Sequence, residues 1–123
     1  MAENFTIEFY ETIRGECPAL EFVKAQNVKM RAKIYRMLDL LEHYGNALRM
    51  PYSEHLNDGI FQIRAQVGSD ITRVLYFFFD GKKIIVTNGF AKKTQATPPS
   101  EIEMAKKYRD DYLFRRANDE KIS

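Results

Sequence analysis

The chain has 123 residues, of which 45% are hydrophobic and 29% charged, with a formal net charge of +2. This length suits one domain, residues 1 to 123, and the composition excludes a disordered chain. No apolar run approaches the roughly 20 residues of a membrane span, and the acidic N-terminus lacks the basic and apolar blocks of a secretion signal. We therefore expect a cytoplasmic protein without membrane contact.

The first half of the chain predicts a strand followed by a helical hairpin. Residues 5 to 10 alternate apolar and polar side chains with period two, as a half-buried strand does. Pro18 suits the first turn of a short helix that we expect to reach about Gln26. Apolar residues recur every three or four positions over residues 28 to 44, which indicates an amphipathic helix whose apolar stripe, up to Tyr44, belongs to the core.

Cysteine and histidine are scarce. A single cysteine, Cys17, cannot form an internal disulfide, which suits a reducing compartment. The two histidines, His43 and His55, give no spacing typical of a zinc site. We expect no metal site and no cofactor.

The second half predicts a loop, a sheet and a final helix. After a loop at residues 46 to 59, the strand candidates IFQIRAQV, DITRVLYFFF and KKIIVTNGF are separated by Gly-Ser and Asp-Gly, dipeptides typical of type II′ and I′ turns. They predict a three-strand antiparallel meander. Ser100 and Glu103 match a capping box, so a helix should begin at Ser100, with a polar tail that frays over about residues 117 to 123. The predicted fold class is α+β.

Positive charge is concentrated in the predicted meander. Residues 60 to 100 contain six Lys and Arg against two Asp, although the whole chain is nearly neutral. If both turns have two residues, Arg64 lies opposite Arg73, and Arg73 lies opposite Asn88. Like charges facing each other destabilise a sheet, so such a row indicates a carboxylate between them or a gap for an anionic ligand.

The two acids of this block lie at the turns, so neither is well placed between the arginines. This favours a gap for an anionic ligand, and a phosphate matches the planar fork of arginine. A turn longer by one residue would instead move one arginine to the other face.

Four further candidates lie near this row. Lys92 and Lys93 follow the last strand and would extend the row into a phosphate-binding cleft, although an exposed lysine pair is also ordinary surface. Phe90, at the strand exit, is a candidate for stacking on a base. His55, in the loop before the meander, is of a type suited to acid–base chemistry, with a surface histidine of no role as the alternative.

The segments LNDGIFQIRAQVGSDITRVLYFF and GKKIIVTNGFAKKTQATPPSEIEMAKKYRDDY resemble the phage-derived branch of the RelE/HigB toxins of bacterial toxin–antitoxin systems. The similarity covers residues 50 to 112, and GFAKKTQATP is its most specific part. Gln62 departs from the pattern, which often has Glu there. The resemblance implies a RelE-like α+β fold, related to small microbial ribonucleases, whose cleft has basic residues at Arg64, Arg73, Lys92 and Lys93.

The same resemblance implies a toxin that cuts mRNA in the ribosomal A site and thereby inhibits translation. It also implies a HigA-like antitoxin with a helix-turn-helix domain, with no DNA contact by the toxin chain alone. Metal-free cleavage requires a base for the 2′-OH proton, positive charge on the phosphorane and an acid for the 5′-oxygen. We expect Arg64 and Arg73 to stabilise the phosphate and Lys92 or Lys93 to transfer protons, with Asn88, Phe90 and His55 binding RNA.

Two other classes of function remain as alternatives. A non-catalytic RNA- or protein-binding module of phage origin would keep the same basic face, but only a nuclease leaves RNA ends with 2′,3′-cyclic phosphate. A small-molecule enzyme has little support, because the sequence contains no Gly-rich phosphate loop and no nucleophile paired with a base.

Overall fold

The computed structural model describes residues 4–92 and 96–122. Its elements are β1 (Thr6–Phe9), α1 (Pro18–Lys24), α2 (Val28–Tyr44), the short 3-10 helix η1 (Gly45–Ala47), β2 (Ser53–Asn57), β3 (Ile60–Val67), β4 (Asp70–Phe79), β5 (Lys83–Ala91) and α3 (Pro99–Ile122). The strands form one five-stranded sheet in the order β1-β5-β4-β3-β2. Only the β1–β5 pair is parallel within this sheet. This mixed architecture confirms the predicted α+β class and is consistent with a RelE-like fold.

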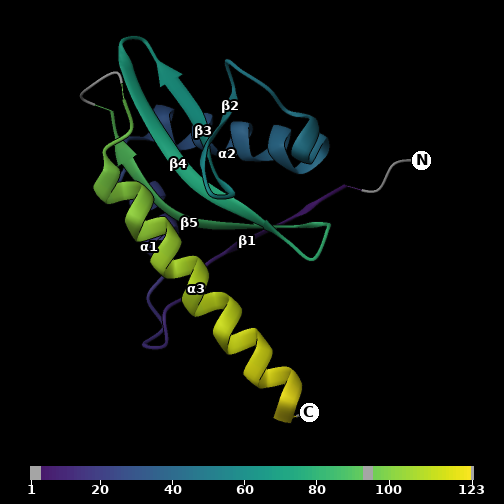
Figure 1. Cartoon of the computed structure of the whole chain (residues 1–123). Coiled ribbons are helices and arrows are strands. Elements are labelled where there is room, and N and C mark those ends of the chain that lie inside the picture. The colour runs from purple at the N-terminus through teal and green to yellow at the C-terminus, as the bar shows by residue number, and fades with distance from the viewer. Residues whose placement is uncertain (1–3, 93–95, 123) are drawn as a thin grey trace.

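Helices lie on both faces of the sheet, with α3 crossing one face and the α1–α2 hairpin on the other (Figure 1). Side chains alternate along each strand, so every central strand contributes to two cores. The core under α1 and α2 includes Ile34, Leu41, Ile63, Val74 and Val86. The core under α3 includes Ile60, Leu75, Ile85, Ala105 and Tyr112.

The helical hairpin follows its sequence signals. Asn27 caps α2, because its side-chain oxygen accepts a hydrogen bond from the Met30 amide at 2.9 Å. Gly45 ends α2 with a φ of 54°, and a Cβ there would lie 2.0 Å from a ring carbon of Phe5. This position therefore requires glycine both for its backbone conformation and for the close approach of β1.

The predicted loop at residues 46 to 59 contains a strand that the sequence did not indicate. β2 pairs with β3 through a turn at Asp58 and Gly59, which have φ values of 50° and 77°. The antiparallel meander therefore has four strands rather than three. β2 was missed because it is an edge strand with mostly exposed side chains, so it lacks alternating apolar residues.

The predicted register is correct in one hairpin and wrong in the other. Arg64 lies opposite Arg73, as the two-residue Gly-Ser turn predicts. Arg73, however, lies opposite Phe90, and Asn88 lies opposite Leu75.

Two departures from a simple hairpin cause this error. Phe79 pairs with Lys83, so the β4–β5 turn has one residue more than expected, and β5 has an irregularity at Thr87, between the partners of Leu75 and Tyr76. Each departure changes the register by one residue. Together they shift it by two, so Asn88 stays on the α3 face of the sheet but lies two residue pairs away from Arg73.

The last helix begins at Pro99, one residue before the predicted start, and continues to Ile122. Fraying over residues 117 to 123 stays a prediction. Within residues 4–92 and 96–122, no helix is long and apolar enough to cross a membrane.

Candidate functional site

A cavity of about 190 Å³ opens on the α3 face, at the end of the sheet where β3 ends and β4 begins. It is lined by Met50, Pro51, Tyr52, Ser53, Glu54, Gln62, Arg64, Arg73 and Lys92. Because three of these side chains are cationic and one is anionic, we call it the cationic pocket. The structure thus brings together the two predicted arginines and one of the two predicted lysines. Lys93 lies outside the described residues.

Arg73 is the most unusual of these side chains. It is only 9% exposed, and its Nε atom has no hydrogen-bond partner among the described residues. Burial lowers the pKa of Arg73, Glu54 opposes that shift, and Arg64 adds to it. Arginine still keeps its charge, so a buried guanidinium with unused hydrogen-bonding capacity lines the cavity.

Arg64 is oriented by a short chain of neutral groups. Its Nη2 atom donates to Oε1 of Gln66 at 2.6 Å, and the amide of Gln66 donates to the carbonyl of Gly68 at 2.9 Å. These bonds hold the guanidinium without neutralising it. Arg64 therefore adds its full charge to that of Arg73 directly across the strand pair.

Lys92 follows β5 and is fixed through its backbone amide, which donates to the carbonyl of Ile71 at 2.8 Å. Partial burial and the charges of Arg73 and Arg64 lower the pKa of Lys92, whereas Glu54 raises it. A lysine with a lowered pKa gives up its proton more readily than an ordinary surface lysine.

Glu54 is the charged pocket residue that the sequence reasoning missed. It lies in β2 opposite Gln62, and it influences the pKa of both Arg73 and Lys92. A regular hairpin closed by the Asp58–Gly59 turn would have placed His55 opposite Gln62. The irregularity between His55 and Asn57 puts Glu54 there instead.

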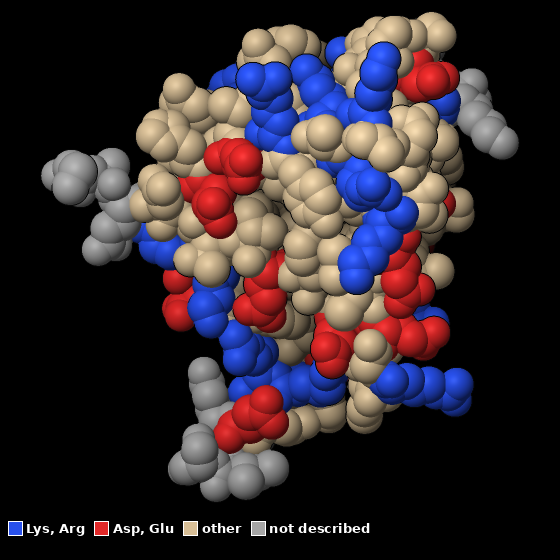
Figure 2. Space-filling model, turned by 180° about the vertical axis from the view of Figure 1, so that it is seen from behind, with Lys and Arg blue, Asp and Glu red and all other residues tan. Residues whose placement is uncertain are grey.

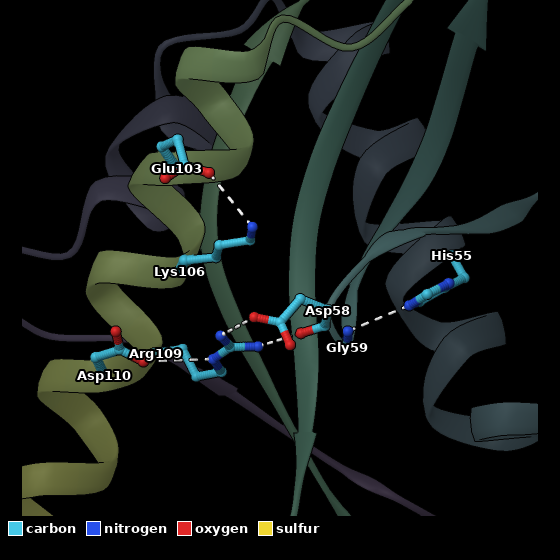
Figure 3. Close-up of polar contacts among 7 residues, drawn as sticks. All are labelled: His55, Asp58, Gly59, Glu103, Lys106, Arg109 and Asp110. Carbon is cyan, nitrogen blue, oxygen red and sulfur yellow. Dashed lines mark hydrogen bonds and ion pairs between the residues drawn. The ribbon is translucent and has the colours of Figure 1, made fainter.

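His55 accordingly lies away from the cationic pocket. Its ring lies against Phe61, with centroids 4.9 Å apart, and Phe61 packs in the core under α1 and α2. Its Nε2 atom accepts a hydrogen bond from the Gly59 amide at 3.2 Å (Figure 3). In this position the side chain braces the β2–β3 turn.

The same turn is anchored to α3 from its other side. Nη2 of Arg109 donates to the Asp58 carboxylate at 2.9 Å, and Nη1 donates to the Asp58 carbonyl (Figure 3). The pKa of Asp58 is lowered, first by this hydrogen bond and then by the charge of Arg109. Arg109 therefore helps to fix the position of β2, the strand that carries Glu54.

Asn88 and Phe90 do not line the cationic pocket. Asn88 is buried, and its Nδ2 atom donates to the backbone carbonyl and to the carboxylate of Glu101, at 3.2 and 3.0 Å. Phe90 is half-buried against the core under α3. Gln62 forms part of the pocket wall, and its Oε1 atom accepts from the Thr97 hydroxyl at 2.5 Å.

Charge is distributed unevenly on the far face as well. Viewed from the side opposite α3, basic side chains are densest at the end of the molecule where the cationic pocket opens. A second group of basic side chains lies at the other end, where acidic side chains are mixed with them (Figure 2).

The sequence matches one family model over most of its length. Residues 21–110 match the model of the family described as phage derived protein Gp49-like (DUF891). The chain belongs to this family. It is a family of RelE/HigB-like toxins of toxin–antitoxin systems, which is associated with toxin endoribonucleases and implies an antitoxin partner. No curated protein matches the chain.

Proposed function

We propose that this protein is the toxin of a type II toxin–antitoxin system and inhibits translation by cleaving mRNA in the ribosomal A site. The observation that carries the proposal is the cationic pocket, in which Arg64, Arg73 and Lys92 surround one carboxylate, Glu54. RNA cleavage through the 2′-OH requires both positive charge for the phosphorane and groups that transfer protons.

The pocket residues suit separate roles in this reaction. Arg73 and Arg64 stabilise the phosphorane, because each guanidinium offers several donors in a fixed geometry. Glu54 takes the proton from the 2′-OH. The ribose 2′-oxygen then attacks the adjacent phosphorus. Lys92 gives its proton to the departing 5′-oxygen, which leaves a 2′,3′-cyclic phosphate on one product and a 5′-hydroxyl on the other. None of these steps requires a metal ion.

The proposal includes a HigA-like antitoxin with a helix-turn-helix domain as the partner that restrains the toxin. Coexpression with that antitoxin should relieve growth inhibition by the wild-type chain. If the partner binds the toxin without restoring growth, the antitoxin part of the proposal fails.

The test of cleavage uses ribosomes stalled on a defined mRNA with an open A site. We expect the wild-type protein to cut within the A-site codon and to leave a 2′,3′-cyclic phosphate. Arg73→Met should reduce the cleavage rate about 100-fold or more, the usual cost of removing a group that stabilises transition-state charge. Arg116→Met is the matched control, because Arg116 is a residue of α3 that contacts Glu8 and Tyr112, and it should be dispensable for cleavage.

A second control replaces the A-site nucleotide at the cut with its 2′-deoxy form, which should abolish cleavage without preventing binding. If folded wild-type protein binds the programmed ribosome but leaves the mRNA intact, the chain is a non-catalytic RNA-binding module. Cleavage of the 2′-deoxy message would contradict the proposed attack by the 2′-OH.

A further inference from the structure

A second hollow, of about 390 Å³, adjoins the cationic pocket. Its lining consists of Leu40, Tyr44, Ala47, Leu48, Arg49, Met50 and Tyr52. We call it the tyrosine hollow. Met50 and Tyr52 line both cavities, so the two lie side by side and share part of their wall.

The tyrosine hollow presents apolar side chains to solvent. Tyr44 and Tyr52 are each 48% exposed, and Met50 is 71% exposed. Single exposed apolar residues are normal on protein surfaces, but several around one hollow indicate a binding site. Tyr44 is notable because its place in the apolar stripe of α2 predicted a core residue.

The segment that carries these side chains is held firmly to the sheet. The Tyr52 carbonyl accepts a hydrogen bond from the Arg64 amide at 2.9 Å, which ties it directly to the cationic pocket. The hydroxyl of the buried Ser53 donates to the Leu48 carbonyl at 3.1 Å. The exposed rings therefore stand on a fixed backbone, so binding would require little ordering of this segment.

The chemistry of the two cavities together selects a nucleotide. An occupant must have an anionic group for Arg64, Arg73 and Lys92 and a flat apolar group for the adjoining tyrosines. In a nucleotide these groups are one sugar apart. Aromatic side chains stack on bases of any identity, and Arg49 at the rim adds positive charge.

We propose that the tyrosine hollow binds the base of the nucleotide whose phosphate occupies the cationic pocket. This inference rests on the proposed function, because it assumes that the cationic pocket holds an RNA phosphate. It adds a base-binding subsite that favours a stacked base without hydrogen-bond readout of its identity.

The test measures binding of a short single-stranded oligodeoxynucleotide, an uncleavable analogue of the RNA, by fluorescence anisotropy. The probe has 2′-deoxy sugars so that it stays intact, and in a series of otherwise identical probes each base in turn is removed. With the wild-type protein, removal of one particular base should weaken binding about tenfold, as expected for the loss of one stacking contact. The double variant Tyr44→Leu/Tyr52→Leu should bind the intact probe about tenfold more weakly and should no longer distinguish the probe that lacks this base.

Tyr35→Leu is the matched control, because Tyr35 is an exposed tyrosine of α2 that lines neither cavity. It should behave like the wild type. Thermal unfolding establishes that each variant is folded, and the single variants Tyr44→Leu and Tyr52→Leu replace the double variant if that one unfolds.

The outcomes separate this inference from the proposed function. Arg73→Met should weaken binding of intact and base-lacking probes equally and preserve their ratio. A double variant that keeps the wild-type ratio overturns the base subsite and leaves the cationic pocket intact. If Arg73→Met has no effect while the tyrosine variants lose binding, the base subsite stands and the proposed function fails.

A protein partner for the tyrosine hollow is also distinguishable. Sedimentation of the purified chain as a dimer that dissociates in the tyrosine variants, with RNA binding unchanged, would make the hollow a self-association surface. That result overturns the base subsite.

Discussion

The α3 face of the sheet has one end covered by the helix and one end open at the cationic pocket. Basic and acidic side chains occur at both ends, but in different proportions. Where α3 covers the sheet, arginines have acidic neighbours: Arg109 lies 2.9 Å from Asp58, Arg115 lies 2.8 Å from Asp111, and Arg116 lies 3.9 Å from Glu8. In the cationic pocket, three cations share the single carboxylate of Glu54. Paired arginines at the covered end fasten the helix, whereas the excess of charge at the open end is suited to an anionic ligand.

Burial increases this contrast. Among the described residues, Arg73 is the only charged side chain that is buried, yet it belongs to the end with fewer acids. A buried charge whose nearby carboxylate is shared with two other cations opposes folding, so its presence in the open pocket is better explained by ligand binding than by stability. Substitutions at the open end should therefore affect cleavage, and substitutions at the covered end should affect stability.

The largest expected effect is on catalysis at the open end. Glu54→Gln should lower the cleavage rate about 100-fold or more, because it removes the base that takes the 2′-OH proton. The same change should leave binding of uncleavable RNA unchanged or tighter, because it removes a negative charge from the phosphate site. Single-turnover cleavage on ribosomes and anisotropy with a 2′-deoxy probe measure the two effects. Equal losses in both would show that Glu54 supports the shape of the pocket instead.

Arg73→Lys should have the next largest effect. Lysine keeps the charge but offers no planar fork, so we expect cleavage to fall about tenfold or more, yet less than in Arg73→Met. Cleavage rates of the two variants, measured side by side, check this order. A lysine variant with full activity would mean that charge alone is required.

At the covered end, Tyr10→Phe should reduce stability and leave cleavage unchanged. The buried Tyr10 hydroxyl donates to the Asp111 carboxylate at 2.5 Å, and losing a hydrogen bond to a charged group costs about 1.5–3 kcal/mol. Burial, followed by this contact with Asp111, raises the pKa of Tyr10 to about 12.

The pH dependence of this variant follows from the raised pKa. The protonated hydroxyl stabilises the folded state fully below the ordinary tyrosine pKa of about 10, and its contribution is lost as pH rises through about 12. Urea unfolding over this range should therefore show a steeper fall in the free energy of unfolding for the wild type than for Tyr10→Phe. If the free energy of unfolding falls equally steeply with pH in both proteins, the stabilising role of the Tyr10 hydroxyl is contradicted.

Arg109→Met should have the smallest effect. The lowered pKa of Asp58 means that this ion pair stabilises the folded state above the ordinary range of aspartate and is lost as pH falls through the lowered value. The variant should thus be slightly less stable than the wild type at neutral pH, and the difference should disappear in acid. Urea unfolding at several pH values tests this, with Asp58→Asn expected to give the same profile.

The sequence predicts most of the fold and the three cations of the cationic pocket, for identifiable reasons. Arg64 and Arg73 were placed correctly because a Gly-Ser turn with positive φ at Gly68 fixes their register. Asn88 was misplaced because the β4–β5 turn has one residue more than the Asp-Gly dipeptide predicts and β5 has an extra residue at Thr87. An extra residue in a strand is set by packing on both faces, which a single sequence does not display.

Glu54 was missed for a related reason. β2 is an exposed edge strand, and its irregular pairing puts Glu54 at the position that His55 would take in a regular hairpin. The Asp58–Gly59 dipeptide could have indicated the hairpin, but it would then have favoured His55 as the pocket residue. Tyr44 shows the complementary limit, because helical periodicity identifies an apolar face but does not indicate where the neighbouring layer ends.

The parallel pairing of β1 with β5 has a consequence for the moment at which the protein becomes active. Thr6–Phe9 pair with residues 83 to 86, so the sheet cannot be completed until most of the chain has left the ribosome that makes it. Lys92 comes later still, and the ring of Phe5 in turn packs against Gly45, where the segment leading to the tyrosine hollow begins. A partly synthesised chain therefore lacks a finished pocket, so the proposed activity would begin only when translation of its own message is nearly complete.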